Sequence, residues 1–138
     1  MTYKQRYDEG DEQFKVHREL EVEVDSYENM RAILTSLGYR QVQSYEKYRE
    51  TYGEADTKYC LDTMPYGEFL EIEGTKATIQ RSASQLGLEW KNRILLNYLE
   101  LFEKIKQHLH LPFNDVTFHN FQGVKTDFKE FILTHRAG

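Results

Sequence analysis

The spacing of apolar residues changes several times along this chain of 138 residues. Between Phe14 and Val24, apolar residues occupy every second position except Arg18, and mostly charged residues lie between them. Alternation with a period of two is typical of a β-strand with one face buried. We therefore predict a strand from Phe14 to Val24 and a shorter one from Thr2 to Tyr7.

A helical period follows. Asp25 or Ser26 is suited to cap a helix, and Gly38 is suited to end it. Apolar residues recur between them at helical spacing, which predicts an amphipathic helix; they are Met30, Ile33, Leu34 and Leu37.

The next stretch, which ends at Gly74, predicts three strands joined by two tight turns. The turns are expected at Thr51–Glu54 and Met64–Gly67, where Gly and Pro residues favour a reversal of the chain. The expected strands are Tyr39–Thr51, Ala55–Thr63 and Glu68–Glu73.

The remainder of the chain predicts helices. Thr75 is a plausible N-cap for a helix that ends at Gly87, and the longest helix is expected from Asn92 to Leu109. A last short helix is expected within Thr126–His135. Five antiparallel strands with helices on the outer face make an α+β fold, and no linker or repeat divides it, so we expect one domain over residues 1–138.

Composition excludes several classes of protein. The 18 basic and 23 acidic residues give a formal charge of −5, which argues against a nucleic-acid partner. The single cysteine, Cys60, rules out an internal disulfide and favours a reducing, cytoplasmic location. No aliphatic run is long enough to span a membrane, so no membrane partner is expected.

Charged residues occupy strand positions where apolar residues are more usual. Lys47 and Arg49 lie two apart on one predicted strand, and Glu71 and Glu73 lie two apart on another. Side chains two apart on a strand share a face, and Asp62 lies on the strand between. A sheet face that carries both cations and carboxylates suits a polyphosphate with its metal ion.

The basic residues allow two interpretations. Lys47 and Arg49, together with Lys4 and Arg6 on the first strand, could bind phosphate oxygens. They could equally be solvated residues on an open sheet face. The spacing alone leaves both interpretations open.

The acidic residues also allow two. Asp62, Glu71 and Glu73 could hold Mg²⁺ or Mn²⁺, which prefer carboxylate and phosphate oxygens, or Glu71 and Glu73 could protect an edge strand from aggregation. A second acidic row could pair with the cations or be the solvated face of an amphipathic strand; its members are Glu19, Glu21 and Glu23.

An ordered series of segments resembles the CYTH domain superfamily. The clearest are YEKYRE at 45–50, Leu61-Asp62, and FLEIEG at 69–74. The opening Thr2–Lys4, the helix at 25–38 and the tail segments at 98–100 and 111–113 follow the order of the family. The resemblance therefore extends over nearly the whole chain.

The resemblance implies a tunnel of antiparallel strands with a polar interior, as in class IV adenylyl cyclases, thiamine triphosphatases and inorganic triphosphatases. Basic residues in such a tunnel bind a triphosphate, and carboxylates bind Mg²⁺ or Mn²⁺. Carried over to this chain, the phosphate ligands would be Lys4, Lys47 and Arg49, and the metal side would be Asp62, Glu71 and Glu73.

The chain departs from the family at its start, because the E-x-E-x-K strand of the family does not occur. The run Glu19–Glu23 lacks the lysine and matches a later strand of the family. The resemblance thus implies an N-terminally truncated half-barrel. Either two chains pair as a homodimer to complete the sheet, or the natural protein is longer, or the sheet stays open without catalysis; we expect the homodimer.

Two functions follow from these observations. The first is triphosphate binding with metal-dependent hydrolysis of inorganic, nucleotide or thiamine triphosphate, with adenylyl cyclase activity as a less favoured variant. The second is a non-catalytic half-domain that self-associates and binds anions without turnover.

Overall fold

The computed structural model describes residues 1–6, 13–54 and 56–137, except for the side chains of Arg6 and Glu54. The chain divides into two compact units, Met1–Val42 and Gln43–Gly138. Within the described residues, strands and helices confirm the predicted α+β class, with antiparallel pairing in two open sheets. Each unit is described by itself below.

The first unit contains a two-stranded sheet and one helix. Strand β1 (Thr2–Arg6) pairs with β2 (His17–Glu21), and Thr2 lies opposite Glu21. Both strands were predicted, but β2 is shorter than the alternating run suggested. Tyr7, the predicted end of the first strand, lies outside the described residues.

Helix α1 (Tyr27–Ser36) forms where its period and caps predicted. The Ser26 side chain accepts a hydrogen bond from the backbone N–H of Asn29 at 3.2 Å, which fixes the N-terminus. Gly38 has a φ of +92°, a conformation that favours glycine, just beyond the end of the helix.

The second unit is built on a three-stranded antiparallel sheet in the order β3-β4-β5. Its strands are β3 (Tyr48–Glu54), β4 (Thr57–Met64) and β5 (Gly67–Glu73). The turn between β4 and β5 falls at Pro65-Tyr66, as predicted.

The other predicted turn is wrong. Residues 51–54 belong to β3, where Thr51 lies opposite Cys60 and Tyr52 opposite Tyr59. A β-branched and an aromatic residue favour a strand, and this pairing outweighs the turn tendency of Gly53. Ala55, the predicted start of the next strand, lies outside the described residues.

The strand predicted to begin at Tyr39 is also too long at its start. Continuous pairing begins only at Tyr48, and in the preceding segment Tyr45 forms an isolated parallel bridge with Val116. The partner of this segment is therefore a distant loop, which the local pattern could not indicate.

Helix α2 (Lys76–Gln85) follows the sheet, and the Thr75 side chain caps it by accepting from the N–H of Thr78 at 3.2 Å. Gly87, with a φ of +69°, lies just beyond its end, as expected. The Tyr59 hydroxyl is 2.7 Å from the Ser82 hydroxyl and so links α2 to the sheet.

The longest helix starts later than predicted. A short 3-10 helix, η1 (Trp90–Asn92), precedes a non-helical segment, and α3 (Tyr98–Leu109) begins after Asn97. Asn97 and Glu100 form a reciprocal capping box, which sets this start. Two short helices complete the unit, α4 (Phe118–Phe121) and α5 (Phe128–Leu133).

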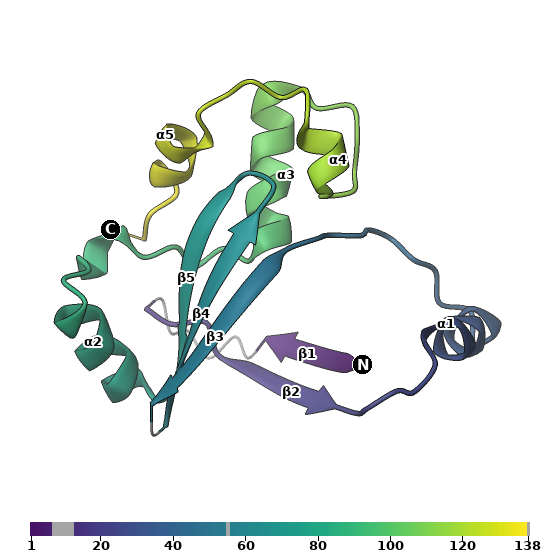
Figure 1. The fold of residues 1–138 in the computed structure, drawn as a ribbon, viewed down its shortest axis with the longest axis horizontal. Helices are drawn as coiled ribbons and strands as arrows, with labels where there is room; N and C mark the ends of the chain where they lie inside the picture. The colour runs from purple at the N-terminus through teal and green to yellow at the C-terminus, as the bar shows by residue number, and fades with distance from the viewer. Residues whose placement is uncertain (7–12, 55, 138) are drawn as a thin grey trace. The chain divides into compact units, whose positions relative to one another are not determined.

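The main core surrounds the turn between β4 and β5, where α3, α4 and α5 gather (Figure 1). Tyr66 in the turn is 1% exposed and packs edge-on against Phe69 and Phe128. The other fully buried side chains of this cluster come from α3 and the following loop: Leu101, Phe102, Ile105 and Val116. Apolar burial thus fixes the helices to one end of the sheet.

This packing predicts a contrast between two leucines. Leu101→Ala removes a side chain that is 1% exposed and leaves a cavity, which should lower the free energy of unfolding by about 2–5 kcal/mol. Leu88→Ala, at a position 47% exposed, should lower it by less than about 1 kcal/mol. Urea denaturation measures both, and equal losses would contradict the assignment of the core.

Candidate functional site

The register of the second sheet places the predicted charged residues on one face. Arg49 lies opposite Asp62, and Glu71 and Glu73 lie opposite Cys60 and Lys58. This face is the inner one, because Asp62 is 1% exposed whereas the neighbouring Leu61, on the other face, is 45% exposed. The structure therefore brings Lys47, Arg49, Asp62, Glu71 and Glu73 together, as their spacing suggested.

Asp62 is the centre of this cluster. Arg49 donates to both oxygens of the carboxylate, from Nε to Oδ1 at 2.6 Å and from Nη2 to Oδ2. Lys47 Nζ donates to Oδ2 at 3.0 Å, and the Tyr98 hydroxyl donates to the same oxygen at 2.8 Å. The buried charge thus has two cationic partners and one neutral donor.

These contacts control the ionisation of the site. Burial alone would raise the pKa of Asp62, but the hydrogen bonds from Arg49, Lys47 and Tyr98 outweigh it and lower this pKa to about 2. The hydrogen bond to Asp62 in turn raises the pKa of Arg49 above its already high value. The ion pair is therefore fully charged at neutral pH.

The two glutamates of β5 complete the cluster on its more exposed side. Glu71 Oε2 accepts from Arg49 Nη2, and Glu73 Oε1 lies 3.8 Å from Arg49 Nη1. Glu73 Oε2 also accepts from Lys58 Nζ at 3.1 Å. Arg49 consequently bridges the buried carboxylate and the two outer ones.

Tyr98 is a site residue that the sequence interpretation missed. It is the first residue of α3, and its ring lies 5.2 Å from Lys47 Nζ and 5.2 Å from the Phe69 ring, centroid to centroid for the rings. Its separation of 36 residues from Asp62 leaves no local pattern that could have revealed the contact. Two signals were available in the sequence: the capping box at Asn97, which fixes where α3 begins, and the resemblance of segment 98–100 to the family.

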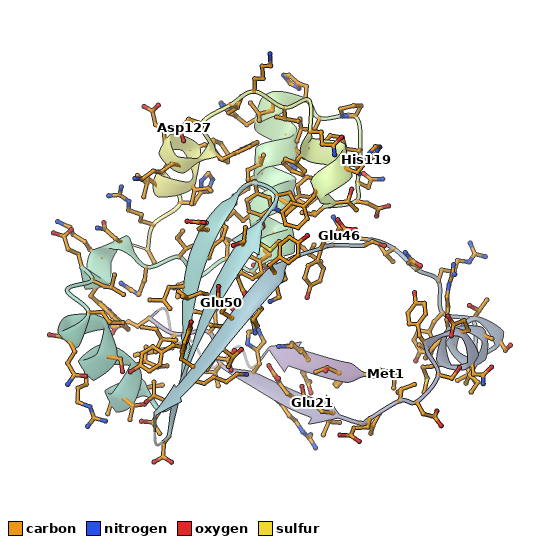
Figure 2. All side chains as sticks on the ribbon, in the orientation of Figure 1. Met1, Glu21, Glu46, Glu50, His119 and Asp127 are labelled. Atoms are coloured by element: carbon orange, nitrogen blue, oxygen red, sulfur yellow. The ribbon has the colours of Figure 1, made fainter. Side chains whose placement is uncertain are left out.

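The segment before β3 is hydrogen-bonded to the loop at Val116 and to the start of α4. The N–H of Glu46 donates to the carbonyl of Val116 at 2.9 Å, and the N–H of Val116 donates to the carbonyl of Ser44 at 2.9 Å. The Glu46 carboxylate accepts from the N–H of Phe118, at the start of the helix that carries His119 (Figure 2). These bonds fix the backbone immediately before Lys47.

The remaining predicted residues belong to the first unit. Lys4 Nζ pairs with Glu19 Oε1 at 2.7 Å, and the Thr2 hydroxyl donates to Glu21 at 3.1 Å. Glu23 lies beyond β2 and is exposed, and the Arg6 side chain is outside the described residues. Glu19 thus pairs with a basic residue on an exposed strand, and the role of this group in ligand binding stays a prediction.

The carboxylates of this cluster supply only some of the oxygen ligands that a hard cation such as Mg²⁺ requires. Among residues whose side chains are described, no three or more Asp, Glu, His or Cys groups are close enough together to hold a metal ion. Both oxygens of Asp62 already accept hydrogen bonds, whereas Glu71 and Glu73 lie on the more exposed side. A metal bound by this pair would need further oxygen ligands, such as those of a phosphate chain.

Comparison with known proteins identifies relatives. The family model of the CYTH domain matches residues 1–101. A protein of Methanocaldococcus jannaschii described as a putative adenylate cyclase is 31% identical over an alignment of 98 positions, and the match covers 63% of this chain and 56% of the relative. The chain thus spans little more than half the length of that relative. No solved structure matches the chain.

Among the described residues, none of the helices is both long enough and apolar enough to cross a membrane.

The ionisation of Asp62 predicts a specific acid sensitivity. Its folded-state pKa of about 2 lies below the ordinary 3.8, so its contribution is complete above about pH 4 and is lost as the pH falls toward 2. This loss should amount to about 2 kcal/mol of unfolding free energy, since one pKa unit corresponds to about 1.4 kcal/mol.

Urea denaturation between pH 5 and pH 2 measures this loss. Asp62→Asn should remove it and should also lower stability at neutral pH, because Arg49 and Lys47 lose their anionic partner. Glu50→Gln, on the opposite face of β3, is the matched control and should keep the loss. An unchanged acid profile in Asp62→Asn would contradict the assignment.

Proposed function

The chain belongs to the CYTH domain family, and we propose that it binds the triphosphate group of a small molecule at the inner face of β3-β4-β5. The observation that carries this proposal is the pair of cations, Lys47 and Arg49, held side by side by the buried Asp62. Two fixed cations on a sheet face are suited to the closely spaced charges of a phosphate chain.

The two cations are oriented yet still accessible. About 20% of the Lys47 side chain and 27% of the Arg49 side chain are exposed, while that of Asp62 is fully buried. The guanidinium of Arg49 contacts Glu71 and Glu73 on its outer side. We infer that phosphate oxygens replace these outer glutamates as partners of Arg49, while Asp62 keeps its hold on the inner side.

We propose that Glu71 and Glu73 hold Mg²⁺ or Mn²⁺ together with phosphate oxygens, and that Asp62, predicted to lie on the metal side, acts by orienting Lys47 and Arg49. When bound, such a cation neutralises charge on the phosphate oxygens. Lys4 and Arg6 remain candidate phosphate ligands from the first unit, with Glu19, Glu21 and Glu23 as partners of the basic residues.

The reaction that this arrangement supports best is hydrolysis. Water attacks the terminal phosphorus and loses a proton to solvent, the bond to the bridging oxygen breaks, and negative charge builds on that oxygen as the shortened phosphate chain leaves. Lys47 and Arg49 stabilise that charge. The substrate class is an inorganic, nucleotide or thiamine triphosphate; the description of the archaeal relative also makes ATP cyclisation a variant to be tested.

Binding without turnover is the second candidate. It is favoured by the small number of carboxylates available to a metal: within the described side chains, no group of three or more acidic, His or Cys residues is placed to hold one. In that case Lys47 and Arg49 would bind the anion, and no phosphate would be released.

Binding and turnover should be measured on the same protein. Calorimetry with tripolyphosphate and ATP in Mg²⁺ or Mn²⁺ should give saturable binding. Arg49→Ala should weaken this binding at least about tenfold, because it removes a charged side chain that can donate two hydrogen bonds to a phosphate. Glu68→Gln, on the opposite face of β5, is the matched control and should bind normally.

Phosphate release and cyclic nucleotide formation are then measured on the same sample. Metal-dependent phosphate release that Glu71→Gln abolishes would support the hydrolase. Normal binding with no product of either kind would favour the second candidate, and unchanged binding by Arg49→Ala would contradict the proposed site.

We further propose that the protein is a homodimer. In the first unit no described residue is buried, and several apolar side chains are exposed, including Leu20 on β2, Ile33 on α1 and Leu37 just beyond the end of α1. A two-stranded sheet of this kind is marginally stable unless its apolar face is covered. A second chain could supply that cover by the self-complementary contact usual in homodimers.

Light scattering at micromolar concentration should therefore give twice the chain mass of 16.5 kDa. Ile33→Asp, at a position 52% exposed on α1, should shift the mass toward that of one chain because it places charge in the apolar contact. Leu88→Asp, comparably exposed in the second unit, should not. A single-chain mass for the unsubstituted protein would exclude the dimer.

A further inference from the structure

We propose that Tyr98 is a positioning residue for triphosphate binding, and that it acts through Asp62 and Lys47. Its hydroxyl binds the buried carboxylate, and its ring lies beside the lysine ammonium. This inference rests on the proposed function of the same site. It adds a residue from the helical part of the chain to a site otherwise built from strands and the segment before them.

The hydroxyl of Tyr98 shares one oxygen of Asp62 with the two cations. Oδ2 accepts from Tyr98 at 2.8 Å, from Lys47 at 3.0 Å and from Arg49 Nη2. Because the Tyr98 hydroxyl is neutral, it occupies part of the hydrogen-bonding capacity of the Asp62 carboxylate and does not neutralise the positive charge of Lys47 or Arg49. Without the hydroxyl, Asp62 would be satisfied by Lys47 and Arg49 alone and would hold both more tightly, away from phosphate oxygens.

The ring of Tyr98 acts on Lys47 directly. The ammonium lies 5.2 Å from the ring centroid, within the range of a cation–π contact. This contact restricts a long, flexible side chain to one region before any anion arrives. Less conformational entropy is therefore lost when Lys47 binds a phosphate.

Tyr98 is itself held rigidly. Its backbone carbonyl accepts from the hydroxyl of Tyr66 at 2.8 Å, and its ring packs edge-on against Phe69. The capping box between Asn97 and Glu100 fixes the backbone on either side. The side chain is thus held by the aromatic core around the turn between β4 and β5, and the core determines where its hydroxyl points.

Calorimetry with tripolyphosphate in Mg²⁺ tests the proposal. Tyr98→Phe removes only the hydroxyl and should weaken binding by about 3- to 10-fold, part of the value of a hydrogen bond to a charged group. Tyr98→Leu also removes the aromatic face and should weaken binding further. The matched control is Tyr52→Phe, which removes an exposed tyrosine-to-carboxylate hydrogen bond of the same 2.8 Å length outside the site and should bind normally.

A double-mutant cycle separates positioning from a general structural role. In an Asp62→Asn background, Tyr98→Phe should change the affinity by less than about twofold, because the hydroxyl acts through the carboxylate. A merely structural role would weaken both backgrounds equally. If Asp62→Asn does not fold, a Lys47→Met background is used instead. This background has no ammonium for the Tyr98 ring to contact. Tyr98→Leu should therefore weaken binding no more than Tyr98→Phe does.

Urea midpoints of the same variants, measured without triphosphate, distinguish failure of the inference from failure of the proposed function. Binding by the unsubstituted chain with unchanged affinity in Tyr98→Phe would overturn the inference and leave the function standing. No binding by the unsubstituted chain, with a midpoint that Tyr98→Phe still lowers, would overturn the function and reduce Tyr98 to a structural residue.

Discussion

The burial of one carboxylate, that of Asp62, constrains the second unit more than any other interaction. A charge that is 1% exposed would cost several kcal/mol if it had no partners. Arg49 and Lys47 supply the compensating charge, and Tyr98 supplies a further hydrogen bond. These donors come from β3, from the segment before it and from α3, so the carboxylate on β4 links three other parts of the chain.

The helices are therefore more than a cover for one end of the sheet. The aromatic core that includes Tyr66 and Phe102 packs α3 against the end of the sheet, and the loop at Val116 anchors the segment that leads into Lys47. Apolar packing at the end of the sheet thus determines where polar groups lie on its inner face. In this unit, stability and the geometry of the site depend on the same contacts.

Much of this arrangement could be predicted from the sequence, but only where the residues that determine it lie close together along the chain. Period-two spacing placed Lys47 with Arg49 and Glu71 with Glu73, and cap residues marked the ends of α1 and α2. The turn expected at Thr51–Glu54 failed because cross-strand pairing outweighed a single glycine. Tyr98 and Val116 could not be found, because each meets its partner across tens of residues and no local pattern encodes the contact.

The balance of charge on the inner face has a consequence for how an anion would reach it. Lys47, Arg49 and Lys58 face Asp62, Glu71 and Glu73, so the face has little net charge, and the whole chain carries −5. Such a surface exerts no long-range attraction on a polyphosphate, and diffusional encounter would not be steered. Binding of the polyphosphate would depend on a step after collision, in which Arg49 exchanges an outer carboxylate for a phosphate oxygen. The protein would therefore discriminate between anions only after they have made contact.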